Sequence, residues 1–232
     1  MDKKIQIIAI VGAMIFSVFV LTSPTNPIPL PEPNINSEND SVTILAENLD
    51  KPRSISISEN RIFVTEQDGF VRVIQNDILL DSPLATFRTA DVFDGGLIGI
   101  ELHPNFSNNH FIYVFLTYLD DGNLWNKIIR ITESDNKLSD SKIIFDKIPG
   151  SSFTNGGFLK FGPDKKLYVG TGTVSDASHL PQDLKSLSGK ILRLNDDGTI
   201  PGDNPFSNSP VYSLGFRNPQ GMTWDDDGNF YV

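Results

Sequence analysis

The 232-residue chain has no cysteine and only three histidines, three methionines and two tryptophans. Without cysteine it can form neither a disulfide nor a thiolate nucleophile. Positive charge is also scarce, because 19 Lys and Arg residues face 29 Asp and Glu residues, for a formal net charge of −10. Binding to nucleic acid needs clustered cations, so this balance argues against a nucleic-acid partner. Small molecules, sugars or cations are better candidates.

Long amphipathic helical patterns are missing as well, outside the N-terminus. The chain contains instead 16 Phe, 18 Gly and 15 Pro residues, with 39% hydrophobic residues. This composition supplies a core and the turn residues that an all-β fold needs. We therefore predict an all-β protein.

The clearest strand signal lies between residues 155 and 169. An apolar run at 158–161 is followed by turn residues at 162–166 and by a β-rich run at 167–169. This pattern predicts a β-hairpin. The Asn155-Gly156-Gly157 sequence before it predicts a tight turn.

Similar strands recur along the chain at residues 62–64, 111–114, 167–169 and 230–232, at steps of 50, 55 and 63 residues from Val64. Repetition at roughly 50 residues is typical of the four-stranded blades of a β-propeller. An all-β sandwich with coincidental spacing is the alternative. Because the last repeat stops inside its strand, we predict a partial propeller over residues 41–232, with about four blade repeats, the last truncated. An open row of blades exposes an apolar face, so we do not expect this part to fold alone.

The N-terminus carries an export pattern. Lys3 and Lys4 precede a run without charged residues from Ile5 to Leu21. Residues 1–22 are therefore predicted to be either a signal peptide or an uncleaved membrane anchor, with the following residues outside the membrane. Residues 23–40 contain five prolines and are predicted to form a semi-rigid linker. We expect an extracytoplasmic protein, either membrane-anchored or secreted.

Four segments, in order, resemble the glucose/sorbosone dehydrogenase family, the soluble aldose sugar dehydrogenases that depend on pyrroloquinoline quinone (PQQ). They are DGGLIGIELHPNF at 94–106, NGGFLKFGPDKKLYVGTG at 155–172, QDLKSLSGKILR at 182–193 and YSLGFRNPQG at 212–221. The resemblance runs from about Leu49 to the last residue. It implies a six-bladed β-propeller, of which this chain is the N-terminal portion.

The resemblance also implies a chemistry. In such enzymes the anomeric hydroxyl of an aldose loses its proton to a base while hydride passes to the quinone. The carboxylates of PQQ need cationic and amide partners, and Arg217 and Asn218 match the family's cofactor-binding pair. The alternative is that Arg-Asn-Pro only caps a loop. The family's Ca²⁺ ligands are expected beyond Val232, since the acidic turns at 195–198 and 225–228 are predicted to be hairpin turns and not metal sites.

The chain departs from the family's pattern at the base. The family's histidine stands where this chain has Thr154, and a hydroxyl cannot accept a proton near neutral pH as imidazole can. Asp94 replaces a Glu or Gln, and Thr173 replaces an Asp. Asp94 and Asn155 are the predicted substrate-binding residues.

Other histidines offer no clear substitute. His103 and His110 adjoin predicted turns and strands, and His179 lies in a loop, so we predict structural or solvated roles for all three. Two functional hypotheses follow. The first is exported, PQQ-dependent oxidation of an aldose at its anomeric carbon, with an unknown electron acceptor. The second is a non-catalytic extracytoplasmic propeller used for binding or protein interaction.

Overall fold

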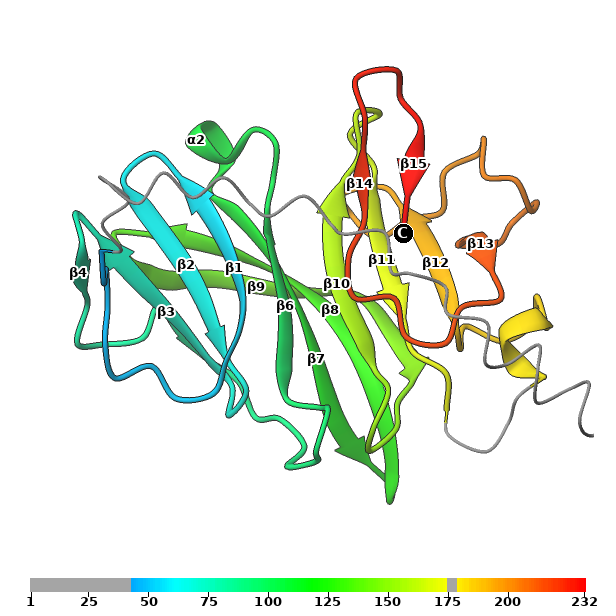
Figure 1. The fold of residues 1–232 in the computed structure, drawn as a ribbon, viewed down its shortest axis with the longest axis horizontal. Helices are drawn as coiled ribbons and strands as arrows, with labels where there is room; N and C mark the ends of the chain where they lie inside the picture. The colour runs from blue at the N-terminus through cyan, green and yellow to red at the C-terminus, as the bar shows by residue number, and fades with distance from the viewer. Residues whose placement is uncertain (1–42, 175–178) are drawn as a thin grey trace, which may run out of the picture. The chain divides into compact units, whose positions relative to one another are not determined.

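Antiparallel strands form nearly all of the regular structure that the computed structural model describes, which covers residues 43–174 and 179–232 (Figure 1). The predicted signal or anchor segment and the proline-rich linker lie outside these residues. Within the described ranges, no helix has both the length and the apolar character that crossing a membrane requires.

The strands form three main sheets and one final hairpin, and in each sheet they are hydrogen-bonded in chain order. The first sheet consists of β1 (Pro52–Ser58), β2 (Arg61–Glu66), β3 (Phe70–Gln75) and β4 (Ile78–Leu79), with β5 (Ala85–Thr86) also paired to β3. The second consists of β6 (Leu97–Leu102), β7 (Phe111–Asp120), β8 (Asn123–Ser134) and β9 (Lys137–Pro149), with the short helix α2 (Phe106–Asn109) between β6 and β7.

The third sheet repeats this arrangement, and a two-stranded sheet follows it. Its strands are β10 (Gly156–Phe161), β11 (Leu167–Thr171), β12 (Lys190–Leu194) and β13 (Val211–Leu214), with the 3-10 helix η1 (Leu180–Gln182) between β11 and β12. The final hairpin consists of β14 (Thr223–Trp224) and β15 (Phe230–Tyr231).

The predicted repeats are confirmed. The four recurring strands of the sequence are β2, β7, β11 and β15, each the second strand of its sheet. The described residues thus form three four-stranded blades and the first hairpin of a fourth, as the prediction of a partial propeller requires. The predicted hairpin is β10–β11, in which Phe161 pairs with Leu167.

The predicted tight turn at residues 155–157 is wrong. Gly156 and Gly157 belong to β10, where the pairing with β11 shifts register between Gly156 and Leu159. Both glycines have positive φ, 68° and 92°. They form an irregularity of the strand and not a turn, because glycine adopts left-handed conformations at a bulge as readily as in a turn.

Strand β7 shows how the blades are held together. Ile112, Val114 and Leu116 face the cluster shared with the first blade, whereas Tyr113 and Phe115 face the cluster shared with the third. All five side chains are buried. A strand covered on both faces needs apolar side chains at every position, which explains the uninterrupted apolar run of this segment.

The first strands of the blades, β1, β6 and β10, lie next to one another (Figure 1). The main chains of β6 and β10 come so close that a Cβ atom built on Gly99 would lie 1.9 Å from the carbonyl oxygen of Gly157. On the far side of β1, Ile55 and Ile57 are exposed, as the predicted open blade face requires. We call β1, β6 and β10 the inner strands. The predicted site residues gather at their amino ends.

Candidate functional site

The loops at the amino ends of the inner strands carry the predicted site residues, and hydrogen bonds join these loops. The Asn155 side-chain amide donates to the main-chain oxygen of Asp94 at 2.8 Å. The backbone N–H of Gly156 donates to Asn218 Oδ1 at 2.8 Å, and that of Thr173 donates to the carbonyl oxygen of Arg217 at 2.8 Å. Residues far apart in the sequence therefore meet at one end of the blades.

A cleft of about 350 Å³ opens at this end. Its lining consists of the residues Pro52, Arg53, Ser54, Asp94, Ile98, Gly99, Gly156, Gly157, Phe158 and Gln220. Of the residues predicted from sequence, Asp94 lines this cleft. Its carboxylate is the sole acidic group among these lining residues, so it is the group here that can accept a proton or the hydrogen bond of a sugar hydroxyl.

Arg53 is a site residue that the sequence analysis missed. Its guanidinium nitrogen lies 2.6 Å from Asp94 Oδ1, and the two side chains are 25% and 16% exposed. The pair joins the start of β1 to the loop before β6, 41 positions further along the chain. No local pattern signals such a contact.

Asn155 is fully buried, and its side-chain amide is fully hydrogen-bonded. Its Nδ2 donates to the main-chain oxygens of Asp94 and Ser151, and its Oδ1 accepts from Asn126 Nδ2 and the Ser151 N–H. This arrangement uses both donors and both lone pairs of the amide. Substrate contact by Asn155 stays a prediction, and what the structure shows is a residue that fixes the loop beside the cleft.

Thr154 is likewise engaged in its loop. Its Oγ1 donates to the carbonyl oxygen of Thr173 and lies 3.2 Å from Ser151 Oγ. Its backbone N–H donates to Ser151 Oγ at 2.9 Å. The hydroxyl at the predicted base position is therefore engaged in hydrogen bonds that hold its loop.

Two donors on loops that hydrogen bonds connect to Thr154 suit an anionic ligand. The Thr173 hydroxyl is buried and finds no hydrogen-bond partner among the described residues. Arg217 is exposed, and within the described ranges its guanidinium forms no ion pair. An unpaired buried hydroxyl is costly unless a ligand or water satisfies it. Donors of this kind are what the carboxylates of a quinone cofactor such as PQQ need.

A metal site has a different pattern, in which several ligand side chains lie close together. Residues 43–174 and 179–232 contain no cluster of three or more His, Cys, Asp or Glu side chains that could hold an ion. The acidic turn at 225–228 joins β14 to β15, where the Gly228 N–H donates to the Asp225 carbonyl oxygen, as the predicted hairpin turn requires.

The histidines lie apart from the cleft lining. His103 stacks with Tyr113, and its Nδ1 accepts from the Asn105 N–H at 2.9 Å. Burial lowers the pKa of His103 in spite of the nearby Asp196. His110 lies 3.4 Å from Glu133, and His179 directly precedes η1. These are the contacts of structural residues.

Lys190, in the third segment of the family resemblance, holds the loop that precedes β12 in place. Its ammonium group donates to the carbonyl oxygens of Leu180, Pro181 and Ser188 at 2.7, 2.9 and 2.7 Å. The residue is fully buried, and this burial lowers the pKa of its ammonium group. Lys190 is therefore unavailable to a ligand in this arrangement.

Arg193, the last residue of that segment, is also used for structure. It forms ion pairs at 2.8 Å with Asp164 and with Asp203. These carboxylates raise its pKa, with Asp203 contributing most. Arg193 thus ties β12 to two loops outside the cleft.

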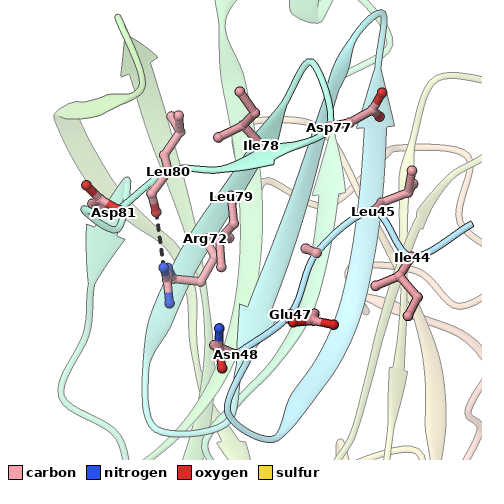
Figure 2. A pocket seen from close by; sticks show the side chains of 11 residues that line it. Ile44, Leu45, Glu47, Asn48, Arg72, Asp77, Ile78, Leu79, Leu80 and Asp81 are labelled. Atoms are coloured by element: carbon pink, nitrogen blue, oxygen red, sulfur yellow. Dashed lines mark hydrogen bonds between the residues drawn. The ribbon is translucent and has the colours of Figure 1, made fainter.

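Another hollow, of about 630 Å³, lies at the outer edge of the first blade (Figure 2). Apolar side chains such as Ile44, Leu45 and Ile78 line it together with Arg72. The Arg72 guanidinium donates to the Leu80 carbonyl oxygen at 3.1 Å. None of the predicted site residues borders this hollow.

Residues 49–232 match the family described as Glucose / Sorbosone dehydrogenase. The chain is 31% identical over 227 residues to quinoprotein glucose dehydrogenase B of Acinetobacter calcoaceticus, which covers 83% of this chain and 47% of that protein. It is 30% identical over 204 residues to aldose sugar dehydrogenase YliI of Escherichia coli (strain K12), covering 82% of this chain and 54% of that protein.

A solved structure agrees with these relatives. The PQQ-bound form of an aldose sugar dehydrogenase from Streptomyces coelicolor superimposes with a TM-score of 0.74 at 34% identity, over 82% of this chain and 57% of that one. The chain thus spans about half the length of the curated relatives it matches.

Proposed function

The chain belongs to the glucose/sorbosone dehydrogenase family, and from that premise we propose that it takes part in PQQ-dependent oxidation of an aldose at its anomeric carbon. The observation that carries this proposal is the cleft at the amino ends of the inner strands, where Arg53 and Asp94 meet beside the loops of Arg217 and Asn218. Bound PQQ supplies the two-electron acceptor.

The residues divide into two groups in this proposal. Arg217, Asn218 and the Thr173 hydroxyl would bind carboxylates of the cofactor, and Asn218 Oδ1 also accepts the backbone N–H of Gly156, which lines the cleft. Asp94, as the carboxylate in the cleft lining, contacts the hydroxyls of the sugar. Asn155 acts as a positioning residue, because its amide is consumed by the loops.

Ca²⁺ completes the proposed cofactor set. It would polarise a quinone oxygen with oxygen ligands of the protein. The family resemblance, and not any cluster of carboxylates among the described residues, is the ground for expecting these ligands beyond Val232. Export, by a signal peptide or an anchor at residues 1–22, is part of the same proposal and rests on the Lys3–Lys4 pair and the apolar run after it.

Quinone titration of the full-length protein tests the proposal. We expect PQQ with Ca²⁺ to bind, and Arg217→Met to weaken binding about tenfold or more, since a charge-assisted hydrogen bond is lost. Arg88→Met, at another exposed arginine, on the segment that follows β5, is the matched control. Absence of any quinone binding by the unaltered protein contradicts the proposal.

A second function is favoured by one observation, the hydrogen bond from Thr154 Oγ1 to the Thr173 carbonyl oxygen. A hydroxyl held in this way cannot act as a base, which favours a propeller that binds its ligands without oxidising them. Replacement Thr154→His separates the two functions. If the protein is a dehydrogenase weakened at its base, the imidazole should raise aldose oxidation about 10²- to 10⁴-fold. If the protein only binds, oxidation stays absent in both forms although PQQ binds.

A further inference from the structure

Two phenylalanine rings stand exposed and in contact at the rim of the candidate site. Phe93 is 80% exposed and Phe153 is 62% exposed. Their ring centroids lie 5.7 Å apart, with the ring planes tilted by 43°. Two large apolar side chains left together in water mark a binding surface more often than a single exposed residue does.

The rings come from two different loops that are fixed to each other. The Asp94 N–H donates to the Ser152 carbonyl oxygen at 2.9 Å, directly behind the pair. Gln67 Nε2 donates to the carbonyl oxygens of Val92 and Phe93 at 3.1 and 3.2 Å. These bonds hold the loop that carries Phe93 against the loop that follows β2.

The second loop has its own support. Ser151 Oγ accepts from the backbone N–H groups of Phe153 and Thr154 and donates to the Thr154 carbonyl oxygen. Asn155 anchors the same loop from inside. The two rings are therefore presented on backbone that is already ordered, so a ligand that contacts them does not have to order the loops first.

The position of the rings relates them to the cleft. Phe93 directly precedes Asp94, and Phe153 lies three residues before Gly156, and both Asp94 and Gly156 line the cleft. A ligand seated on the rings therefore has a carboxylate and the Arg53 guanidinium next to it. This combination of an apolar surface with a few polar groups suits a sugar, whose ring presents C–H groups on its face and hydroxyls at its edge.

We propose that Phe93 and Phe153 form an aromatic platform on which the ring of an aldopyranose stacks, with its hydroxyls directed to Asp94 and Arg53. For the class of substrate, this proposal rests on the proposed function. It goes further in assigning the choice among sugars to Phe93 and Phe153. Sugars in ring form bind the platform, whereas the corresponding open-chain polyol has no such face to offer.

The test measures dissociation constants for D-glucose and for the open-chain polyol D-glucitol, by calorimetry on the full-length protein without quinone. The unaltered protein should bind glucose more tightly than glucitol. Phe93→Ala and Phe153→Ala should each weaken glucose binding about five- to tenfold, and the double variant should bind the two compounds alike. Phe153→Tyr keeps the ring and should keep the preference.

Leu119→Ala is the matched control, since Leu119 is similarly exposed, 63%, but lies at the end of β7 outside the cleft lining. Equal glucose affinities for the unaltered protein and the double variant overturn the proposal, as does the absence of glucose binding by the unaltered protein. PQQ binding is measured in parallel on every variant. Loss of quinone binding alone contradicts the proposed function and leaves the platform standing, whereas unchanged sugar affinity with intact quinone binding rejects the platform alone.

Discussion

Each end of the inner strands has an ion pair in a hollow, but the two pairs differ in distance and in exposure. At the amino ends, Arg53 and Asp94 approach to 2.6 Å in the 350 Å³ cleft. At the carboxyl ends, Lys160 lies 3.6 Å from Glu101 in a hollow of about 560 Å³. The first pair is close and largely shielded, whereas Lys160 is nearly half exposed.

The surroundings differ more than the pairs do. The loops at the amino ends are tied to one another by buried side-chain amides and a buried lysine, notably Asn155, Asn126 and Lys190. At the carboxyl ends, β1–β2 and β10–β11 are joined by turns with local backbone hydrogen bonds, such as Gly162 N–H to the Lys166 carbonyl oxygen. The long-range polar bonds of this end, such as Arg193 to Asp164 and Lys166 to Asn195, have partly exposed partners. The amino end differs in that fully buried polar side chains hold its loops in a fixed geometry.

The largest expected effect follows from breaking the amino-end support at Asn155. Asn155→Leu removes four hydrogen bonds and leaves the Ser151 N–H and the Asp94 carbonyl without partners, so we expect the free energy of unfolding to fall by about 3 to 4 kcal/mol. Asn60→Leu, at the exposed turn between β1 and β2, is the control and should cost less than about 1 kcal/mol. Chemical denaturation measures both, and similar losses would mean that the two ends do not differ in this way.

Lys190→Met should have the next largest effect. It leaves three carbonyl oxygens of the loop between β11 and β12 without their donor, and we expect a loss of about 2 to 3 kcal/mol. Hydrogen exchange should rise in residues 180–189 more than in β6 or β7. A variant as stable as the unaltered protein would show that water replaces the ammonium group without cost.

At the carboxyl end, Glu101→Gln tests the sign of an electrostatic effect. Burial raises the pKa of Glu101, against the opposing effect of Lys160. The carboxylate thus takes up a proton more readily in the folded state, so its contribution to stability is present below the ordinary glutamate pKa and is lost as the pH rises through the raised value. Relative to the unaltered protein, the variant should gain up to about 1 kcal/mol between pH 4 and pH 7. Thermal unfolding across this range measures it, and a parallel pH dependence of both proteins argues against the raised pKa.

The smallest effect on stability is expected at Arg53. Because its pair with Asp94 is partly exposed, Arg53→Met should change the free energy of unfolding by less than about 1 kcal/mol. The same replacement should weaken sugar binding severalfold if the pair serves the cleft. A large loss of stability without any change in sugar binding would make the pair a structural one, like that of Arg193.

Sequence reasoning found the blades because each blade repeats a local signal. An apolar strand after a polar turn is readable in a few residues, and β2, β11 and β15 each follow one, whereas β7 follows the short helix α2. The turn predicted at Gly156 and Gly157 is wrong because paired glycines indicate only that a positive φ is tolerated. They do not show whether the chain reverses direction there. Arg53 and the Thr154–Thr173 bond were missed because each depends on pairing between distant segments, which no short window contains.

The contact between Gly99 and Gly157 has a consequence for how the cleft can change. Where β6 and β10 meet, the wall of the cleft is main chain, and no residue larger than glycine fits without displacing a strand. Substitution of Gly99 or Gly157 is therefore not tolerated at this wall of the cleft. New ligand preferences are therefore expected from the side chains around this wall, such as Arg53 and Phe158 in the lining and Phe93 and Phe153 at the rim.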